Sequence, residues 1–332
     1  RLIPYTNDST HGRAALVGIL NTLLVAFIGC IIATIIGVFV GILRLSKNWI
    51  VAKLMSVYIE GFRNIPILLW IVMIFALLTE FTPAPRAFKG ADPEASMIFF
   101  QSTAVTNRGA YFPSPVWGDG SVYLILIFIL SLAAIFLFRR YAKNLQEETG
   151  KNLPKFWISL AIFFIPSILF YFILGGPVSL EYPYLKGFNF KDGIYVRNSF
   201  IALTLALSLY TSAFIGEIVR SGILAISKGQ TEAASSLGLR PSRIMNLIIL
   251  PQALRVIVPP MISNYLNLTK NSSLAIAVGY MDVRGTLGGI TLNQTGRELE
   301  SMLLLMGFYL CVSLCVSAII NYFNRSFQIK GL

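Results

Sequence analysis

Charged residues are scarce in this chain of 332 residues, where they make up 13% of the sequence against 55% hydrophobic residues. Soluble globular domains carry charge on about a quarter of their residues. A soluble core of this size cannot absorb so much apolar surface. The composition therefore excludes an ordinary soluble protein and indicates an integral membrane protein.

Histidine and cysteine are also few, and this excludes several kinds of chemistry. The one histidine, His11, lies near the start of the sequence, and Cys30, Cys311 and Cys315 lie inside apolar stretches, where packing explains them. The usual Cys and His spacings of a metal site are missing, and a catalytic serine, histidine and acid set cannot be assembled. We therefore expect that the protein has no metal centre and is not an enzyme.

A phosphate-binding loop of the form G-x-x-x-x-G-K-[ST] is absent as well. The nearest run, GTLGGI at Gly285–Ile290, lacks the lysine and a following helix. We therefore expect no cofactor, and in particular no ATP, in this chain. The net charge of +12 comes from short runs of Lys and Arg between apolar segments, where such residues set membrane topology. This placement argues against nucleic-acid binding.

Seven segments are apolar enough for a membrane-spanning helix, which needs about 20 residues. They predict an all-α integral membrane fold. The segments Pro83–Gly120 and Gly175–Arg197 contain Pro, Gly and aromatic residues without an apolar period, and they are predicted to be loops outside the membrane. The predicted spans are Ala14–Leu43, Leu54–Phe81, Val122–Phe138, Phe156–Leu174, Ser199–Ile226, Pro251–Val278 and Met302–Phe323.

The distribution of Lys and Arg predicts the orientation, because cytoplasmic loops are enriched in both. Basic residues follow the first predicted span from Arg44 to Lys53, the third from Arg139 to Lys155, and the fifth from Lys228 to Arg243. These loops and the C-terminus are predicted to be cytoplasmic, and the N-terminus external. The sequence starts at Arg1 without methionine, and we expect one further span upstream of it.

The segment Lys228–Pro251, KGQTEAASSLGLRPSRIMNLIILP, is too polar to insert and predicts two short helices that meet at a turn. Glu232 is expected near the start of the first helix, where the helix dipole favours an acid. Gly238 can adopt the left-handed conformation that ends a helix, and Pro241 suits the first turn of the next.

Ala233, Ala234 and Leu237 lie three or four residues apart in the first of these short helices. This spacing predicts a face of small residues that another protein's groove can approach closely, since a helix laid in a groove is a common recognition mode. The alternative is an amphipathic loop that lies on the membrane surface.

Glu232, Ala233, Ala234 and Gly238, followed by Ile249, Leu250 and Pro251, resemble the EAA signature of ABC importer permeases. The resemblance implies the type I ABC importer transmembrane fold, in which this loop is a coupling helix that docks on a cytoplasmic ATPase. The ATPase-coupling residues that it implies are Gly229, Gln230, Glu232, Ala233, Ala234, Gly238 and Pro251.

Two further stretches, EGFRNIP at Glu60–Pro66 and GEIVRSGILAISKGQ at Gly216–Gln230, resemble the polar amino acid subfamily of these permeases. NRGAYFPSPVWGDG at Asn107–Gly120 resembles the larger general L-amino-acid permease subunit. The resemblance implies five core spans and an insertion with two more. Residues 1–81 then hold the first two core spans, 82–197 the insertion, and 198–332 the remaining core spans with the coupling loop.

Several polar residues at membrane depth are candidates for lining a translocation path, because ionisable groups are costly there. The candidates are Arg63, Asn64, Glu217, Arg220, Lys270, Asn271 and Ser272. Each has a simpler interpretation. Glu217 and Arg220, at i and i+3, can form an ion pair within one helix or reach the interface, and the others can anchor helix ends.

The resemblance implies a permease subunit of an ATP-driven importer of polar L-amino acids in the inner membrane of a bacterium. The expected partners are two copies of an ATP-binding subunit that holds ATP and Mg, a second related permease in a heterodimer, a periplasmic amino-acid-binding protein, and membrane lipid. Transport is expected to proceed by alternating access.

Two other classes of function remain open from the sequence. An ion-driven secondary transporter would show internal repeats with interrupted spans at matching positions, and no such self-similarity is visible. A membrane-embedded enzyme would need a reactive pair or a metal set, which the spans lack, whereas a structural scaffold would lack polar residues that face a path.

Overall fold

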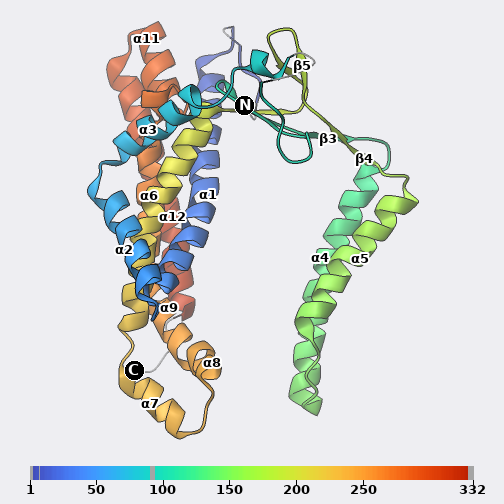
Figure 1. The fold of residues 1–332 in the computed structure, drawn as a ribbon, viewed down its shortest axis with the longest axis vertical. Helices are drawn as coiled ribbons and strands as arrows, with labels where there is room; N and C mark the ends of the chain where they lie inside the picture. Colours follow the sequence, from blue (N-terminus) through green and yellow to red (C-terminus); the bar gives the residue numbers. More distant parts are fainter. Residues whose placement is uncertain (1–2, 7, 90–93, 328–332) are drawn as a thin grey trace. The chain divides into compact units, whose positions relative to one another are not determined.

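The computed structural model describes residues 3–6, 8–89 and 94–327, with side chains up to residue 318. The chain forms two compact units. The helical unit comprises Arg1–Thr82 and Arg197–Leu332, and the inserted unit comprises Pro83–Val196. Among the described residues, six helices are long and apolar enough to cross a membrane, or seven if one bent pair counts as a span (Figure 1). The predicted all-α membrane fold is confirmed.

The helical unit contains long helices joined by short helical segments. Its α-helices are α1 (His11–Arg44), α2 (Trp49–Asn64), α3 (Ile67–Glu80), α6 (Asn198–Leu224), α7 (Lys228–Ser236), α8 (Pro241–Ile244), α9 (Leu250–Asn271), α10 (Val283–Gly285), α11 (Leu292–Thr295) and α12 (Glu298–Phe327). Two π-helical turns, η2 (Met245–Ile249) and η4 (Thr286–Thr291), and the 3-10 helix η3 (Ser272–Val278) connect them.

The centre of the helical unit is the contact between α1 and α6, which run parallel. Gly29 faces Ser208, Gly37 faces Ile215, and further along Gly41 faces the backbone of Gly216. The backbones approach so closely that a Cβ on Gly37 would lie 2.7 Å from the Cβ of Ile215. Small residues allow this approach between membrane helices, where dispersion contacts replace the hydrophobic effect as the main attraction.

Helices α3 and α9 pack against this pair in the opposite direction. Leu268, near the end of α9, packs on Gly29, whereas Ile257, in the middle of α9, packs on Gly222 near the end of α6. The amide of Asn198, at the start of α6, donates to the carbonyl oxygen of Leu78 at the end of α3 (3.3 Å). The alternating directions of these helices match the predicted topology of the core spans.

The second core span differs from its prediction, which placed one helix over Leu54–Phe81. Helices α2 and α3 are bent by 106° at a break between Asn64 and Ile67. The cause is Pro66, because a residue before proline avoids helical backbone angles and Ile65 is extended (φ −101°, ψ 133°). The 14 residues of α3 are about 21 Å long, which is short for a bilayer core of about 30 Å.

The inserted unit combines a pair of long helices with short antiparallel strands. A three-stranded sheet has the order β1-β2-β7, and β3 pairs with β4 and β5 with β6. Phe88, Tyr111 and Phe190 pack as a small aromatic cluster. The elements are η1 (Pro85–Phe88), β1 (Ala104–Thr106), β2 (Gly109–Phe112), β3 (Ser114–Trp117), α4 (Ser121–Thr149), α5 (Lys155–Ile173), β4 (Val178–Glu181), β5 (Tyr184–Lys186), β6 (Asn189–Lys191) and β7 (Ile194–Arg197).

The third predicted span, Val122–Phe138, is too short, because α4 continues to Thr149. Arg139 and Lys143, which were expected in a loop, lie on this helix. The predicted span ended where charge begins, but Lys, Arg, Glu and Gln are good helix formers. The helix therefore continues beyond its apolar part and ends at Gly150, which adopts a left-handed conformation (φ 70°).

Replacement of Gly37 by alanine should destabilise the protein by about 1–3 kcal/mol, because the added methyl group overpacks the contact with α6. Gly61→Ala is the matched control, since Gly61 also lies within a helix and has no atom within 4 Å of an added Cβ. The control should gain up to about 1 kcal/mol from helix propensity. Heat denaturation of the purified transporter checks both, and an equal shift in the two variants would contradict the close packing.

Candidate functional site

The α7–α8 loop (Lys228–Ile244), which is the predicted coupling loop, folds as two short helices that meet at a tight turn, as predicted. Gly238 has φ 75°, its N–H donates to the Ser235 carbonyl (2.9 Å), and the Leu239 N–H donates to the Ala234 carbonyl (3.3 Å). These are the two hydrogen bonds of a Schellman motif, which ends a helix with a left-handed glycine. Pro241 lies in the first turn of α8, where its missing N–H costs nothing.

The position of Glu232 differs from the prediction. Helix α7 begins at Lys228, so Glu232 is its fifth residue and lies beyond the first turn. The helix starts earlier than expected because Ser227 already has the extended angles of an N-cap (φ −61°, ψ 140°). The Glu232 side chain is exposed, and the helix dipole has little effect on it, since that effect is confined to the terminal turn.

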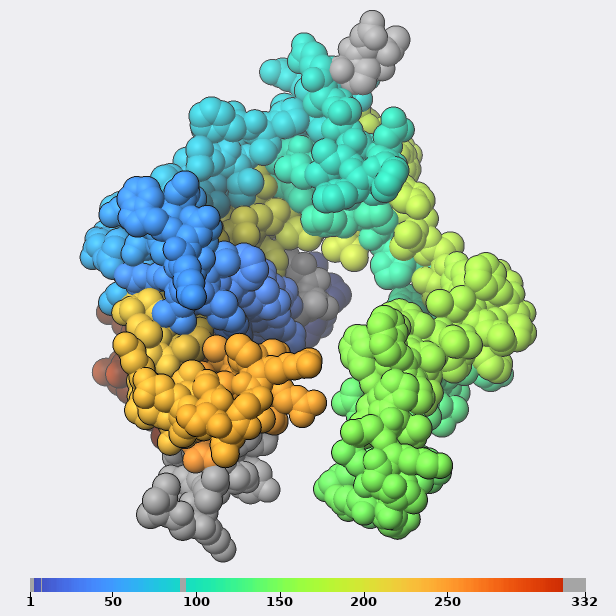
Figure 2. Space-filling model, turned by 60° about the horizontal axis from the view of Figure 1, so that its bottom comes forward, coloured from blue at the N-terminus to red at the C-terminus, as the bar shows by residue number. Residues whose placement is uncertain are grey.

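The predicted small-residue face is divided between two sides of α7. Ala234 is buried, with 2% exposure, whereas Ala233 and Leu237 are exposed one turn apart. Gly229 and Gln230 are exposed as well. Between Lys228 and Ile244, Ala234 and Ile244 are the only buried residues. Most of the loop's surface is thus exposed. In Figure 2 the loop lies on the near side of the helical unit.

Pro251 lies beyond the loop, within the first two residues of α9. The π-helical turn η2 directly precedes α9 and connects it to α8 without a break in the helical backbone. Single π-helical turns of this kind occur frequently at functional sites. The Pro251 side chain is exposed, so the residue sets the backbone at the start of a membrane helix rather than packing in the core.

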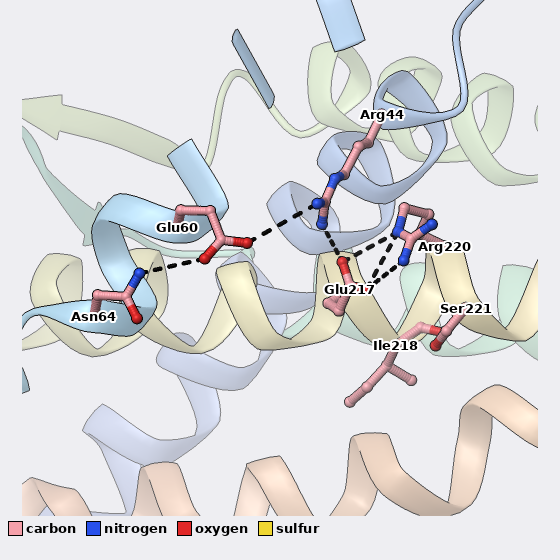
Figure 3. Close-up of polar contacts among 7 residues, drawn as sticks. All are labelled: Arg44, Glu60, Asn64, Glu217, Ile218, Arg220 and Ser221. Carbon is pink, nitrogen blue, oxygen red and sulfur yellow. Dashed lines mark hydrogen bonds and ion pairs between the residues drawn. The ribbon is translucent and has the colours of Figure 1, made fainter. Parts of the chain in front are cut away.

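Glu217 lies at the centre of a charge cluster at the end of α1, α2 and α6 (Figure 3). Its carboxylate accepts a hydrogen bond from Arg220 Nη2 (2.6 Å) on its own helix and one from Arg44 Nη1 on α1. Arg44 also lies 4.0 Å from Glu60 on α2, and the amide of Asn64 donates to Glu60 (3.3 Å). The structure thus contains the ion pair between Glu217 and Arg220 that the simpler interpretation predicted. Through Arg44, Glu217 is also paired with the neighbouring helix α1.

Arg63 lies beside this cluster. Its guanidinium lies 5.3 Å from the centroid of the Phe214 ring on α6, within the range of a cation–π interaction. Arg63 and Asn64 form the last turn of α2, directly before the bend at Pro66. Arg63 therefore contacts α6, whereas Asn64 bonds Glu60 on its own helix, so both groups already have neighbours in this chain.

Lys270, Asn271 and Ser272 lie elsewhere in the helical unit. They mark the end of α9, where the α-helix becomes the 3-10 helix η3. Lys270 is exposed, whereas Ser272 is fully buried and donates to the Thr269 carbonyl (2.7 Å). Leu268 packs beside Ser208, and Glu217 lies nine residues further along α6, about 14 Å away along the axis. The structure therefore does not join the predicted path residues into one site.

A buried polar cluster around Asp282 was not predicted from the sequence. Asp282 is fully buried and accepts from the N–H of Gly285 (2.8 Å), so it caps α10. The amide of Asn21 on α1 donates to the Met281 carbonyl (2.7 Å), and the Thr22 hydroxyl accepts from the N–H of Val283 (3.0 Å). An Asp directly before a short helical run is a sequence signal for a cap, but its partners on α1 are distant in sequence.

The fold and the exposed loop define a multi-pass membrane protein of the importer-permease class. The family described as binding-protein-dependent transport system inner membrane component matches residues 148–329, more than half of the chain. The chain belongs to this family, whose members are components of transport systems rather than enzymes.

Two bacterial relatives match almost the whole chain. The glutamate/glutamine/aspartate/asparagine transport system permease protein BztB of Rhodobacter capsulatus is 53% identical over 99% of this chain and 82% of its own length. The general L-amino acid transport system permease protein AapQ of Rhizobium johnstonii is 43% identical over 97% of this chain and 78% of its own length. They confirm the resemblance to the polar amino acid permeases.

A solved structure, the crystal structure of an amino acid ABC transporter with histidines, covers 95% of this chain and 94% of its own chain, with a TM-score of 0.54. The sequence identity is 19%, so this likeness concerns the fold alone. It agrees with the type I ABC importer fold that was predicted from the loop.

Replacement of Glu217 by glutamine should destabilise the protein by about 1–3 kcal/mol, because it leaves Arg44 and Arg220, both less than a third exposed, without their shared carboxylate. Glu147→Gln is the matched control. It removes the pair with Lys143 on α4, which is 3.6 Å long and largely exposed, and should change stability by less than about 0.5 kcal/mol. Thermal unfolding of the purified transporter compares the two, and equal effects would refute the role of the cluster.

Proposed function

We propose that the chain is the permease subunit of an ATP-driven importer of polar L-amino acids, in which the α7–α8 loop receives the motion of a partner ATPase. The observation that carries the proposal is the exposure of this loop. A nine-residue helix with one buried side chain has little internal reason to remain folded, and contact with a partner supplies that reason.

The charge cluster supports a mechanical role for the loop. Glu217 lies two turns before the end of α6 at Leu224, and α7 begins four residues after that end. Because Glu217 binds Arg44 of α1, a displacement of α7 is transmitted to two helices rather than one. The η2 turn transmits the same displacement to α9. We infer that these connections open the path inward, by alternating access, when the ATPase subunits close.

The proposed substrates follow from the relatives. One is named for the transport of glutamate, glutamine, aspartate and asparagine, and the other for general L-amino acids. Their match to nearly the whole chain includes the inserted unit, so we extend the substrate class of polar L-amino acids to this chain. The residues that line the path are proposed to include Arg63, Asn64, Glu217, Arg220, Lys270, Asn271 and Ser272.

The proposed assembly supplies what this chain lacks. ATP and Mg are bound by two copies of an ATP-binding subunit, so the chain itself needs no cofactor. A second related permease forms a heterodimer with it in the bacterial inner membrane, and a periplasmic amino-acid-binding protein delivers the substrate. The family description, which names both binding-protein dependence and the inner membrane, supports the binding protein and the membrane, whereas the ATP-binding subunits and the second permease follow from the resemblance to ABC importer permeases.

Gly238→Val should abolish most ATP-driven uptake while ATP hydrolysis by the assembled complex continues, because a β-branched residue is strained at φ 75° and displaces α7 from α8. Gly238→Asn should retain uptake, since Asn tolerates the left-handed conformation. Uptake of radiolabelled glutamate into proteoliposomes, measured together with phosphate release, tests both variants.

Gly150→Val provides the control for strain alone, because Gly150 has φ 70°, ends α4 and has no atom within 4 Å of an added Cβ. This variant should transport normally. Normal uptake by Gly238→Val would refute the coupling role of the loop. Uptake that follows an imposed ion gradient without ATP would instead favour a secondary transporter.

A further inference from the structure

An open groove runs between α4 and α5 in the inserted unit and has a volume of about 660 Å³, within the range of roughly 300–1,000 Å³ for small-molecule sites. One wall includes Leu124 and Phe128 of α4, one turn apart, and the other includes Ile168 and Phe172 of α5. The two helices lie side by side as a hairpin (Figure 1). Both are apolar enough to span a membrane, so the groove opens at the depth of the bilayer.

The two hydroxyl groups of the groove already form hydrogen bonds within the chain. The Ser167 hydroxyl donates to the carbonyl of Phe163 (3.0 Å), and the Tyr171 hydroxyl donates to the carbonyl of Val178 (3.2 Å). The rest of the lining is almost entirely apolar. The hydroxyl groups on the two walls therefore need no hydrogen bond from a bound molecule, so a hydrocarbon chain suits the groove best.

The groove lies at one end of the hairpin. Leu124 is close to the start of α4 at Ser121, and β3 pairs with β4 directly beyond the helices, with Trp117 opposite Val178. Trp117 also lines the groove. This end is the external one, because the basic residues from Arg139 to Lys155 lie at the other end of the hairpin. Trp and Tyr are enriched at the level of the lipid headgroups, and Trp117 and Tyr171 both line this end of the groove.

A membrane helix of a partner subunit fits the groove less well than a lipid. Contacts between membrane helices use small residues that let the backbones approach. Apart from Ser167, the lining consists of large aliphatic and aromatic side chains, which hold a helix backbone away but surround a thin flexible chain. Toward the middle of the hairpin, the ring of the lining residue Phe128 is in edge contact with the Phe163 ring, with centroids 5.1 Å apart.

From these observations we propose that the α4–α5 groove binds one acyl chain of a phospholipid from the outer leaflet, with Trp117 and Tyr171 at the level of its glycerol and headgroup. The walls extend over about one helical turn from Leu124 to Phe128, roughly 6 Å. The groove thus holds the part of the chain nearest the glycerol, and the remainder lies in the bilayer. The proposal does not depend on what the transporter carries.

Native mass spectrometry of the intact transporter, extracted with its partner subunits in a mild detergent, tests the proposal. The wild type should retain at least one phospholipid. Ser167→Trp places an indole in the groove and should raise the apparent Kd of the bound lipid by roughly tenfold, as expected when about two methylene contacts are lost. Leu124→Trp narrows the groove from the other wall and should weaken lipid retention in the same direction, which covers the case that one variant fails to assemble.

Ile173→Trp is the matched control, because Ile173 is 66% exposed and projects from another side of α5 by helical periodicity. It adds the same indole to the same helix and should leave lipid retention unchanged. Ser167→Ala should also retain the lipid, since the hydroxyl is not needed. A wild type without bound lipid, or undiminished retention by assembled Ser167→Trp and Leu124→Trp complexes, would overturn the proposal.

Discussion

The close approach of α1 and α6 is the constraint on which the helical unit depends. Two parallel membrane helices gain little from the hydrophobic effect, so they need backbone proximity and good packing to associate. Gly29, Gly37 and Gly41 provide this proximity on α1. The proximity brings Arg44, at the end of α1, to Glu217 on α6, and this contact joins α1 to the part of α6 that precedes the α7–α8 loop.

The rigid pair contrasts with the elements around it. Helices α2 and α3 are bent by 106° at Pro66, and η2 replaces ordinary helix by a π-helical turn just before α9. The bend directly follows Arg63 and Asn64, which lie beside Phe214 and Glu60, and η2 directly follows α8 of the α7–α8 loop. Closely packed helices and irregular helical segments therefore occur within the same helical unit.

The sequence predicted the spans well, because hydropathy is a local property that each segment carries by itself. It also predicted the turn at Gly238, since few residues other than glycine adopt φ 75° without strain. The bend at Pro66 was harder to predict, because a proline indicates that a helix is interrupted but does not indicate the angle of the bend. The place of Glu232 beyond the first turn of α7 could have been predicted, since Ser227 is a typical N-cap residue and puts the helix start at Lys228.

Contacts between distant segments were the main omission. Arg44 and Glu217 are 173 residues apart, and no spacing rule connects them. The same holds for the bonds of Asn21 and Thr22 with the residues around Asp282. One signal was present and overlooked: Gly29, Ala33, Gly37 and Gly41 repeat every four residues and mark the face of α1 that packs on α6. The predicted path residues remain a prediction, because the described residues place them in two separate parts of the helical unit.

The central claim is that the exposed side of α7 contacts an ATP-binding subunit. A photoreactive amino acid at Leu237, which is 82% exposed, tests it most directly in intact membranes that contain all the partner subunits. The account predicts a crosslink between this chain and the ATP-binding subunit, and no such crosslink from the same amino acid at Glu148, which is exposed near the end of α4. Equal crosslinking at both positions, or none at Leu237 in an assembled complex, would contradict it.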